Sequence, residues 1–302
     1  MKVLKVLKVT AITTLLNMVV LLAAAVLPVA AQVAPGSAKS SGEHFKGYDD
    51  WHFSVNLAGW LSSFQGDVAA RGSTSQLDVT LDDVLDLLFH GKIDFTMDGR
   101  FEVSKGPWGV YGELEYVRLS DSGEGRKDID IPIFRPPGFT IQGNAEVISV
   151  YAVAEAALTY DVYASPRLVG NMPELIAEVL GGGRYQYIRT KVNLDLAGPL
   201  RDRSFEADES RSWVDPFVGG RILWRPGVNW ITSLETDFGG FGVGSDFTFN
   251  IRADAAYRIN RWFFVNAGYR ALYTDYESGS GDEGFDYNLW VHGPFFGVGV
   301  EF

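Results

Sequence analysis

Charged side chains recur at every second position in several stretches of this chain. Asp94, Asp98, Arg100 and Glu102 share one side of an extended backbone, because successive strand residues point to opposite faces. Carboxylates so placed could act as general acids or bases, line an ion path, or pair with guanidinium groups. The same alternation predicts an inward-facing charge set of Asp94, Asp98, Arg100, Glu102, Glu113, Glu115, Glu155, Arg184, Asp215, Arg221, Glu235, Asp237, Arg252, Asp254, Arg258 and Arg270, with Glu301 at the end.

The histidines offer little for catalysis or metal binding. Hydrolytic chemistry needs a general base, usually histidine, beside a nucleophile or an activated water. His44 lies in a flexible lead-in and His90 in a loop, while His52 is expected to point inward near one rim. His292 falls on the outward face unless a bulge at 293–294 turns it inward. These positions are too little for a catalytic site, and no two histidines have ligand spacing; we therefore expect no catalytic site, no metal site and no cofactor.

The first residues predict export. Lys2, Lys5 and Lys8 precede an apolar segment, and 29–31 have the small-residue form of a signal-peptidase site. We expect 1–31 to be a signal peptide rather than a retained anchor, 32–50 a flexible lead-in, and 51–302 the folded domain. Removal of 1–31 takes the formal net charge from −12 to −15, which argues against nucleic acid as a partner. The chain has no cysteine, so disulfides and thiolate metal sites are excluded.

Two-residue periodicity dominates after residue 50 and predicts strands. The ten segments are 51–62, 92–104, 108–120, 146–160, 175–191, 212–225, 229–240, 247–259, 261–276 and 287–302. Each exceeds the roughly nine to eleven residues that a tilted strand needs to cross a bilayer. Periodicity alone would also suit a soluble sandwich, but short and long connections take turns along the chain, which is typical of an up-and-down transmembrane barrel. The sequence therefore predicts an all-β antiparallel barrel of ten strands, with eight or twelve as alternatives.

The connections carry further expectations. The long links 63–91, 121–145 and 192–211 should be extracellular loops, and Leu77–Leu88 should form an amphipathic helix capped by Thr80. Gly181–Gly183 suggests a bulge or bend. The glycine-rich stretch 237–244 fits a tight hairpin better than a phosphate-binding loop. An aromatic belt is expected at the short-turn ends of the strands, from Trp51, Trp108, Trp224, Trp230, Trp262 and Tyr257.

The last segment places Phe296, Val298, Val300 and Phe302 on one face, which should meet lipid. This ending resembles the C-terminal signal that the barrel-assembly machinery of Gram-negative bacteria reads. With LDVTLDDVLDLL, FTMDGRFEVSKGPWGVYGELEYVRLS, WVDPFVGGRI, DFGGFGVGSDFTFN, GYRALYTDYE and HGPFFGVGVEF, the chain is similar to a largely uncharacterised family of small outer-membrane barrel proteins. The resemblance implies an outer-membrane location, with lipid and the assembly machinery as partners, and no established activity.

A small barrel has an interior that its own side chains nearly fill. Opposed carboxylates and guanidiniums inside it can satisfy one another, whereas a lone buried charge costs several kcal/mol. We therefore predict an occluded, salt-bridged lumen and a structural role in the envelope. A narrow passive channel for small polar or ionic solutes is the alternative, and a barrel enzyme a distant third. The oligomeric state is left open.

Overall fold

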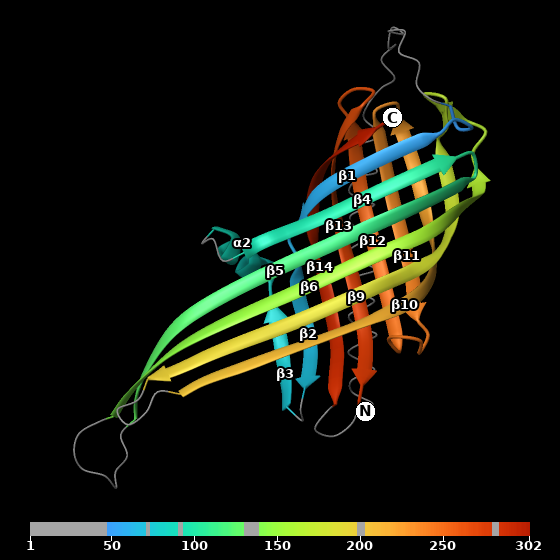
Figure 1. Ribbon diagram of the computed structural model, residues 1–302. Helices are drawn as coiled ribbons and strands as arrows, with labels where there is room; N and C mark the ends of the chain where they lie inside the picture. The colour runs from blue at the N-terminus through green and yellow to red at the C-terminus, as the bar shows by residue number, and fades with distance from the viewer. Residues whose placement is uncertain (1–46, 71–72, 90–92, 130–138, 198–202, 280–283) are drawn as a thin grey trace.

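The fold is seen in a computed structural model that describes residues 47–70, 73–89, 93–129, 139–197, 203–279 and 284–302. The predicted signal peptide 1–31 and most of the lead-in 32–50 lie outside the described residues. In the described part, ten antiparallel strands close into a barrel, as predicted (Figure 1). They are β1 (His52–Trp60), β4 (Ile93–Lys105), β5 (Trp108–Ile129), β6 (Phe139–Ala164), β9 (Leu175–Ala197), β10 (Arg203–Gly227), β11 (Trp230–Gly240), β12 (Phe247–Arg258), β13 (Phe263–Ser278) and β14 (Phe285–Glu301).

Alternating side chains give the wall two unlike faces. In β5, Tyr111, Glu113 and Glu115 are buried inside the barrel, while Val110 and Leu114 are exposed on the outside. A shift of one residue would exchange the two sets, so the apolar pattern fixes the register of each strand. The closed sheet also pairs the peptide groups of its terminal strands, because β1 pairs with both β4 and β14.

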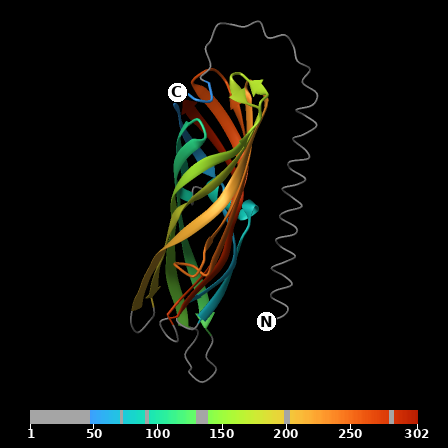
Figure 2. The ribbon, with the colours of Figure 1, turned by 90° about the vertical axis from the view of Figure 1, so that its right-hand side faces the viewer.

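The short turns gather at the end of the barrel where the C-terminus lies (Figures 1 and 2). Backbone hydrogen bonds tie them together: Phe53 and Phe302 exchange two, and Glu301 N–H donates to the Trp262 carbonyl in the β12–β13 turn. Gly106, in the β4–β5 turn, has a φ of 55°, in the region that favours glycine. The longer link from β6 to β9 carries a small hairpin of β7 (Leu168–Val169) and β8 (Met172–Pro173).

The sheet branches beside its closing seam. β2 (Ser63–Ala70) continues the path of β1 and pairs with the outer half of β14, and β3 (Ser73–Val79) folds back on β2. On the other side, β1 pairs with β4 only as far as Ala58 opposite Asp98. Among the described residues, no backbone pairing joins β3 to β4 or β5. The β2–β3 hairpin and the outer parts of β4 and β5 therefore follow separate paths (Figure 1).

The middle strands are longer than predicted. Residues 121–129, 139–145, 192–197 and 203–211 are strand, although the sequence analysis assigned them to loops. Their ladders are nevertheless continuous, with Ser120 opposite Ile148 in β5–β6 and Arg203 opposite Leu196 in β9–β10. Backbone pairing beyond the bilayer does not need an apolar face, which explains the error.

The first long link contains the predicted helix, α2 (Leu81–Phe89), in a shorter form. Thr80 caps it: its hydroxyl accepts from Asp83 N–H at 3.3 Å, and Asp83 Oδ2 accepts from Thr80 N–H at 2.9 Å. Hydrogen bonding from Thr80 holds the pKa of Asp83 below its usual value. Leu77 and Val79 belong to β3 instead, because the cap starts the helix after Thr80. No helix of the described part is long and apolar enough to cross a membrane.

Two glycine-rich stretches have different outcomes. The expected bulge at 181–183 is absent from the described ladder, where Gly181, Gly182 and Gly183 pair in unbroken register with β6 and β10. Gly182 instead allows close approach, since a Cβ there would lie 2.0 Å from the Ala156 carbonyl oxygen. The predicted hairpin in 237–244 joins β11 to β12, and Gly240, Phe241 and Gly242 adopt positive φ values of 86°, 52° and 74°.

Candidate functional site: the barrel interior

Most of the charges expected to face inward lie inside the barrel. All members of the set except Asp94 have described side chains there, and the buried ones include Asp98, Glu113, Glu115, Glu155, Arg184, Asp215, Arg221, Glu235, Asp237, Arg252 and Arg270. Asp94 lies in β4, and the structure describes only the backbone of this residue. Strand register decides which of these charges meet.

Arg184 of β9 connects three strands. It is completely buried, and its Nε donates to Glu155 Oε1 of β6 at 2.7 Å. Its Nη2 donates to both carboxylate oxygens of Asp237 of β11 at 2.9 Å. The guanidinium also lies 4.8 Å from the ring centroid of Phe217. This arrangement gives the buried guanidinium the hydrogen-bond acceptors that water cannot supply there.

Arg270 and Arg252 converge on Glu113 from the opposite wall. Arg270 Nη1 donates to Glu113 Oε1 at 2.5 Å and Nη2 donates to Glu155 Oε1 at 2.5 Å. Arg270 also contacts Glu115. Arg252 Nη1 donates to Glu113 Oε1 at 2.8 Å. These contacts cross the lumen and link β5 and β6 to β12 and β13.

Two more arginines extend the contacts toward the short-turn end. Arg100 Nη1 donates to Glu113 at 2.9 Å and Nη2 donates to Glu235 at 2.8 Å. Arg221 donates to Glu102 at 2.6 Å and to Glu178 at 2.5 Å. The sequence analysis missed Glu178, although alternation from Arg184 through Gly182 and Leu180 places it on the same face. The central charges thus form one continuous layer across the lumen.

Three predicted residues lie outside this layer. Asp215 accepts from Gln186 at 3.1 Å, from Trp213 Nε1 at 3.0 Å and from Ser245 N–H at 2.6 Å, so neutral donors satisfy it. Asp254 accepts from the Ser233 hydroxyl at 2.5 Å. Arg258 pairs with Glu301 at the short-turn rim.

An apolar layer, which the sequence analysis did not anticipate, fills the lumen beyond the charges. On several strands the inward face changes from charged to apolar toward the outer end; in β13, for example, Arg270 is followed by Leu272 and Tyr276. The layer consists of Ala58, Trp60, Val117, Tyr151, Val153, Trp213, Leu272, Tyr276, Phe285, Tyr287, Leu289, Val291 and Phe295. Trp213 stacks on Tyr276 with ring centroids 4.1 Å apart.

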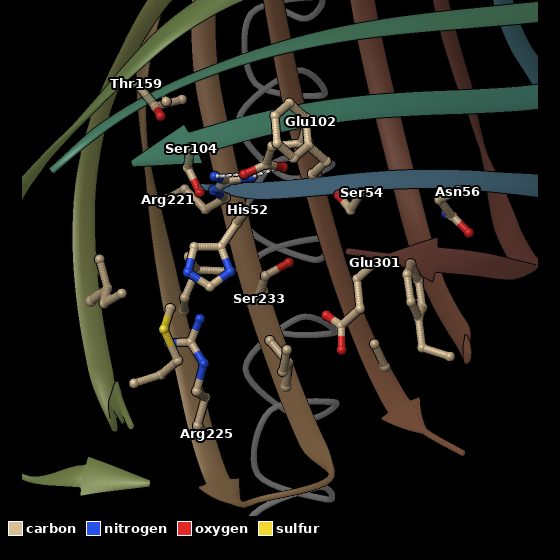
Figure 3. Close-up of a pocket in the computed structure, with 18 of the residues that line it drawn as sticks. His52, Ser54, Asn56, Glu102, Ser104, Thr159, Arg221, Arg225, Ser233 and Glu301 are labelled. Atoms are coloured by element: carbon tan, nitrogen blue, oxygen red, sulfur yellow. Dashed lines mark hydrogen bonds and ion pairs between the residues drawn. The ribbon is translucent and has the colours of Figure 1, made fainter. Parts of the chain in front are cut away.

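A cavity of about 370 Å³ lies on the other side of the charges, at the short-turn end. Figure 3 shows His52, Ser54 and Asn56 of β1 along one wall, with Arg221 bonded to Glu102 and Arg225 beside His52. Arg100 and Arg252, members of the central layer, also line it. At its mouth the Tyr48 hydroxyl donates to Asp161 at 2.6 Å, and burial, with the neighbouring carboxylate, raises the pKa of Tyr48 well above its usual value.

The two described histidines lie on opposite faces of the wall. His52 faces the cavity, and its Nε2 lies 2.8 Å from the Gly47 carbonyl oxygen. His292 lies on the outward face, as strict alternation predicts, where its Nδ1 is 2.7 Å from the Tyr269 hydroxyl. Its Nε2 lies 3.4 Å from Gln65 Oε1. His44 and His90 lie outside the described residues.

The outer face of the wall is apolar and ends in aromatic side chains. Exposed apolar residues follow the outside of β1, β5, β6, β9, β10 and β14, among them Leu57, Leu114, Leu158, Val179, Val218, Phe296 and Val298. Trp51, Trp108, Trp230, Trp262 and Tyr257 are exposed at the short-turn end, whereas Trp224, the sixth residue of the predicted belt, is partly buried. A continuous apolar face of this kind would be unstable in water, whereas a closed sheet can present it to lipid with every strand paired.

This is a β-barrel of the bacterial outer membrane. An apolar outer face of this kind suits lipid, and aromatic side chains gathered at one end are typical of a membrane interface. Phe296, Val298 and Phe302 project outward from β14, and Val300 is less exposed beside them. Whether the assembly machinery reads these four residues stays a prediction.

Comparison with known proteins adds likeness of fold alone. No family model and no curated protein sequence matches the chain. Among solved structures, the outer membrane protease OmpT of Escherichia coli matches 87% of this chain and 100% of its own at 9% identity, with a TM-score of 0.44. Ail, the attachment invasion locus protein of Yersinia pestis, matches 83% and 99% at 11% identity, with a TM-score of 0.28. Neisserial surface protein A matches 83% and 97% at 11% identity, with a TM-score of 0.26.

A charge on the outer face should destabilise the barrel strongly. Leu114 lies on the outside of β5, six residues (114 − 108) from Trp108, and about nine to eleven residues of a tilted strand cross a bilayer, so Leu114 is expected near its middle. Leu114→Arg is expected to lower the free energy of unfolding by about 2–4 kcal/mol, because the arginine must enter hydrocarbon. Urea unfolding in lipid vesicles, followed by tryptophan fluorescence, measures the change. Leu168→Arg, in the hairpin at the short-turn end, is the control; an equal effect at both positions would contradict the lipid-facing assignment.

Proposed function

We propose that this barrel serves a structural, envelope-integrity role with a lumen that does not conduct. The observation that carries the proposal is the pair of successive layers, one charged and one apolar, across the interior. Arg184, Asp237, Leu272 and Phe295 are all completely buried, and together they span both layers. Solutes would have to displace paired charges and packed rings at the same time, at a cost of several kcal/mol.

The proposal includes no catalytic role. Both described histidines have partners consistent with structural positions: His52 approaches a backbone carbonyl, and His292 a tyrosine hydroxyl on the outward face. A general base would instead need a nucleophile or substrate water within reach.

Planar-bilayer recording tests the proposal. We expect no discrete conductance steps from the folded mature chain in salt solution, with insertion verified separately by protection of the barrel from protease. The matched measurement uses the same preparation in vesicles loaded with a small sugar, which should retain the sugar. Steps that recur across independent preparations would favour the narrow passive channel and would end the closed-lumen proposal.

A further inference from the structure

One buried arginine of the cavity at the short-turn end has no charged partner. Arg225 of β10 is 7% exposed and lines this cavity of about 370 Å³, yet it forms no ion pair with any described residue. An arginine stays ionised inside a protein, and a buried charge without a counter-ion is destabilising. Four other arginines that are mostly buried line the same cavity, and each pairs with a carboxylate: Arg100, Arg221, Arg252 and Arg258.

Only one nitrogen of the Arg225 guanidinium is engaged. Nη1 donates to the Pro173 carbonyl oxygen at 3.0 Å, which ties β10 to the small β7–β8 hairpin. Nε is buried and, like Nη2, donates to no residue of the described part. Buried polar groups in folded proteins nearly always have a partner. The contact with the hairpin therefore explains one nitrogen and leaves the edge formed by Nε and Nη2 free, beside His52 in the cavity (Figure 3).

The surrounding carboxylates do not neutralise this charge directly. Three of them act on Arg225 from beyond ion-pair distance, and each has a closer partner: Asp161 has the Tyr48 hydroxyl, Glu178 has Arg221, and Glu301 has Arg258. Arg221 is also shared with Glu102. The arginine next along β10 therefore has two acids to satisfy and none to spare, while Arg225 can accept one further negative charge.

We propose that this cavity binds a small carboxylate at the free edge of Arg225. A guanidinium holds a carboxylate through two parallel N–H···O bonds, and Nε and Nη2 supply two adjacent donors. A singly charged ligand matches the one uncompensated arginine. A doubly charged anion such as phosphate fits less well, because its second charge would meet acids that have no spare counter-ion. The volume lies at the lower end of the roughly 300–1,000 Å³ of small-ligand cavities.

The rest of the lining favours a ligand that also carries hydroxyl groups. Asn56 of β1 and Asn266 of β13 are 7% and 8% exposed, and the Oδ1 atom of each accepts no hydrogen bond from a described residue. Both residues line the cavity, and Ser54 lies on the same wall as Asn56 (Figure 3). Hydroxyl groups on the ligand would donate to these oxygen atoms. A hydroxylated monocarboxylate, of the sugar-acid type, combines both features.

The position of the cavity makes this site independent of conduction. It lies on the short-turn side of the charge layer, so a ligand reaches Arg225 without passing the paired arginines or the apolar layer. The inference goes beyond the proposed structural role and holds whether or not the lumen conducts.

Calorimetric titration of the mature chain, refolded in detergent, with sodium gluconate at constant ionic strength tests the proposal. Wild type should bind one gluconate per chain. Sorbitol, which has a similar hydroxylated body and no carboxylate, should bind about tenfold more weakly or less, and so should inorganic phosphate. Arg225→Met should weaken gluconate binding by about tenfold or more. Arg167→Met is the matched control, because it removes an exposed arginine outside the lining, and it should bind as wild type does.

Thermal unfolding separates binding from the structural contact with Pro173. Gluconate should raise the unfolding midpoint of wild type and of Arg167→Met, and leave that of Arg225→Met unchanged. If Arg225→Met fails to fold, Arg225→Lys decides the question: it keeps the charge but not the two-nitrogen edge, and should bind gluconate more weakly than wild type. The proposal is overturned if wild type shows no saturable binding, if the folded Arg225 variant binds as tightly, or if sorbitol or phosphate binds as well as gluconate.

Discussion

Replacing Arg184 with methionine is expected to lower the free energy of unfolding by about 3–5 kcal/mol. Arg184 is 0% exposed and satisfies Glu155 and Asp237 from two different strands. Methionine fills much of the same space but supplies no charge. The two carboxylates would then remain buried without their shared counter-ion, which is the costly half of breaking an internal ion pair.

Urea unfolding of the protein in lipid vesicles measures this change. Arg167→Met is the matched control, because the Arg167 side chain is 77% exposed and its pair with Glu174 should contribute less than about 1 kcal/mol. Arg184→Met/Asp237→Asn should recover part of the loss, since it removes one of the stranded charges. If Arg184→Met is no worse than the control, the charge layer does not stabilise the barrel.

Phe295→Ala should cost about 3–5 kcal/mol, because it opens a cavity in the apolar layer. Phe295 of β14 is 0% exposed, and the Arg252 guanidinium lies 4.2 Å from its ring centroid. The ring therefore joins the two layers of the lumen. Removing the ring takes away packing from its neighbours in the layer. It also removes the aromatic face that the Arg252 guanidinium contacts.

Phe296→Ala is the control for this position. Phe296 is the next residue and is 61% exposed on the outer face, where its loss removes contact with lipid only. It should destabilise the barrel clearly less than Phe295→Ala in the same unfolding measurement. Equal effects would mean that the interior at Phe295 is not packed, and would argue against the apolar layer.

The strands could be predicted because a wall between lipid and a packed interior imposes a period of two. The ten segments and their short turns follow from that period, as Ile93–Val103 illustrates. The outer strand ends could not be predicted: beyond the bilayer, pairing depends on the partner strand, and polar residues such as those in 121–129 pair as well as apolar ones.

Alternation predicted which charged side chains face the interior, but it did not predict which of them contact one another. Alternation assigns Arg184 and Glu155 to the lumen, but only the register shows that they meet, while Asp215 meets neutral donors instead. Leu272 and Phe295 were not predicted as lumen residues, because only polar side chains were assigned to the inward face. The sequence does not show whether an apolar side chain faces inward or outward. Charged residues earlier in the same strand must first show which alternate positions face the lumen.

The pairing of β1 with β14 has a consequence for how the barrel is made. Ser54 lies opposite Glu301, so the ring closes between the two ends of the folded domain. Until the last strand is in place, both end strands expose unpaired peptide groups, which hydrocarbon cannot solvate. Biogenesis therefore cannot proceed by adding strands one at a time within the bilayer. Either the hairpins insert in concert, or another β-structure must shield the open edges until closure.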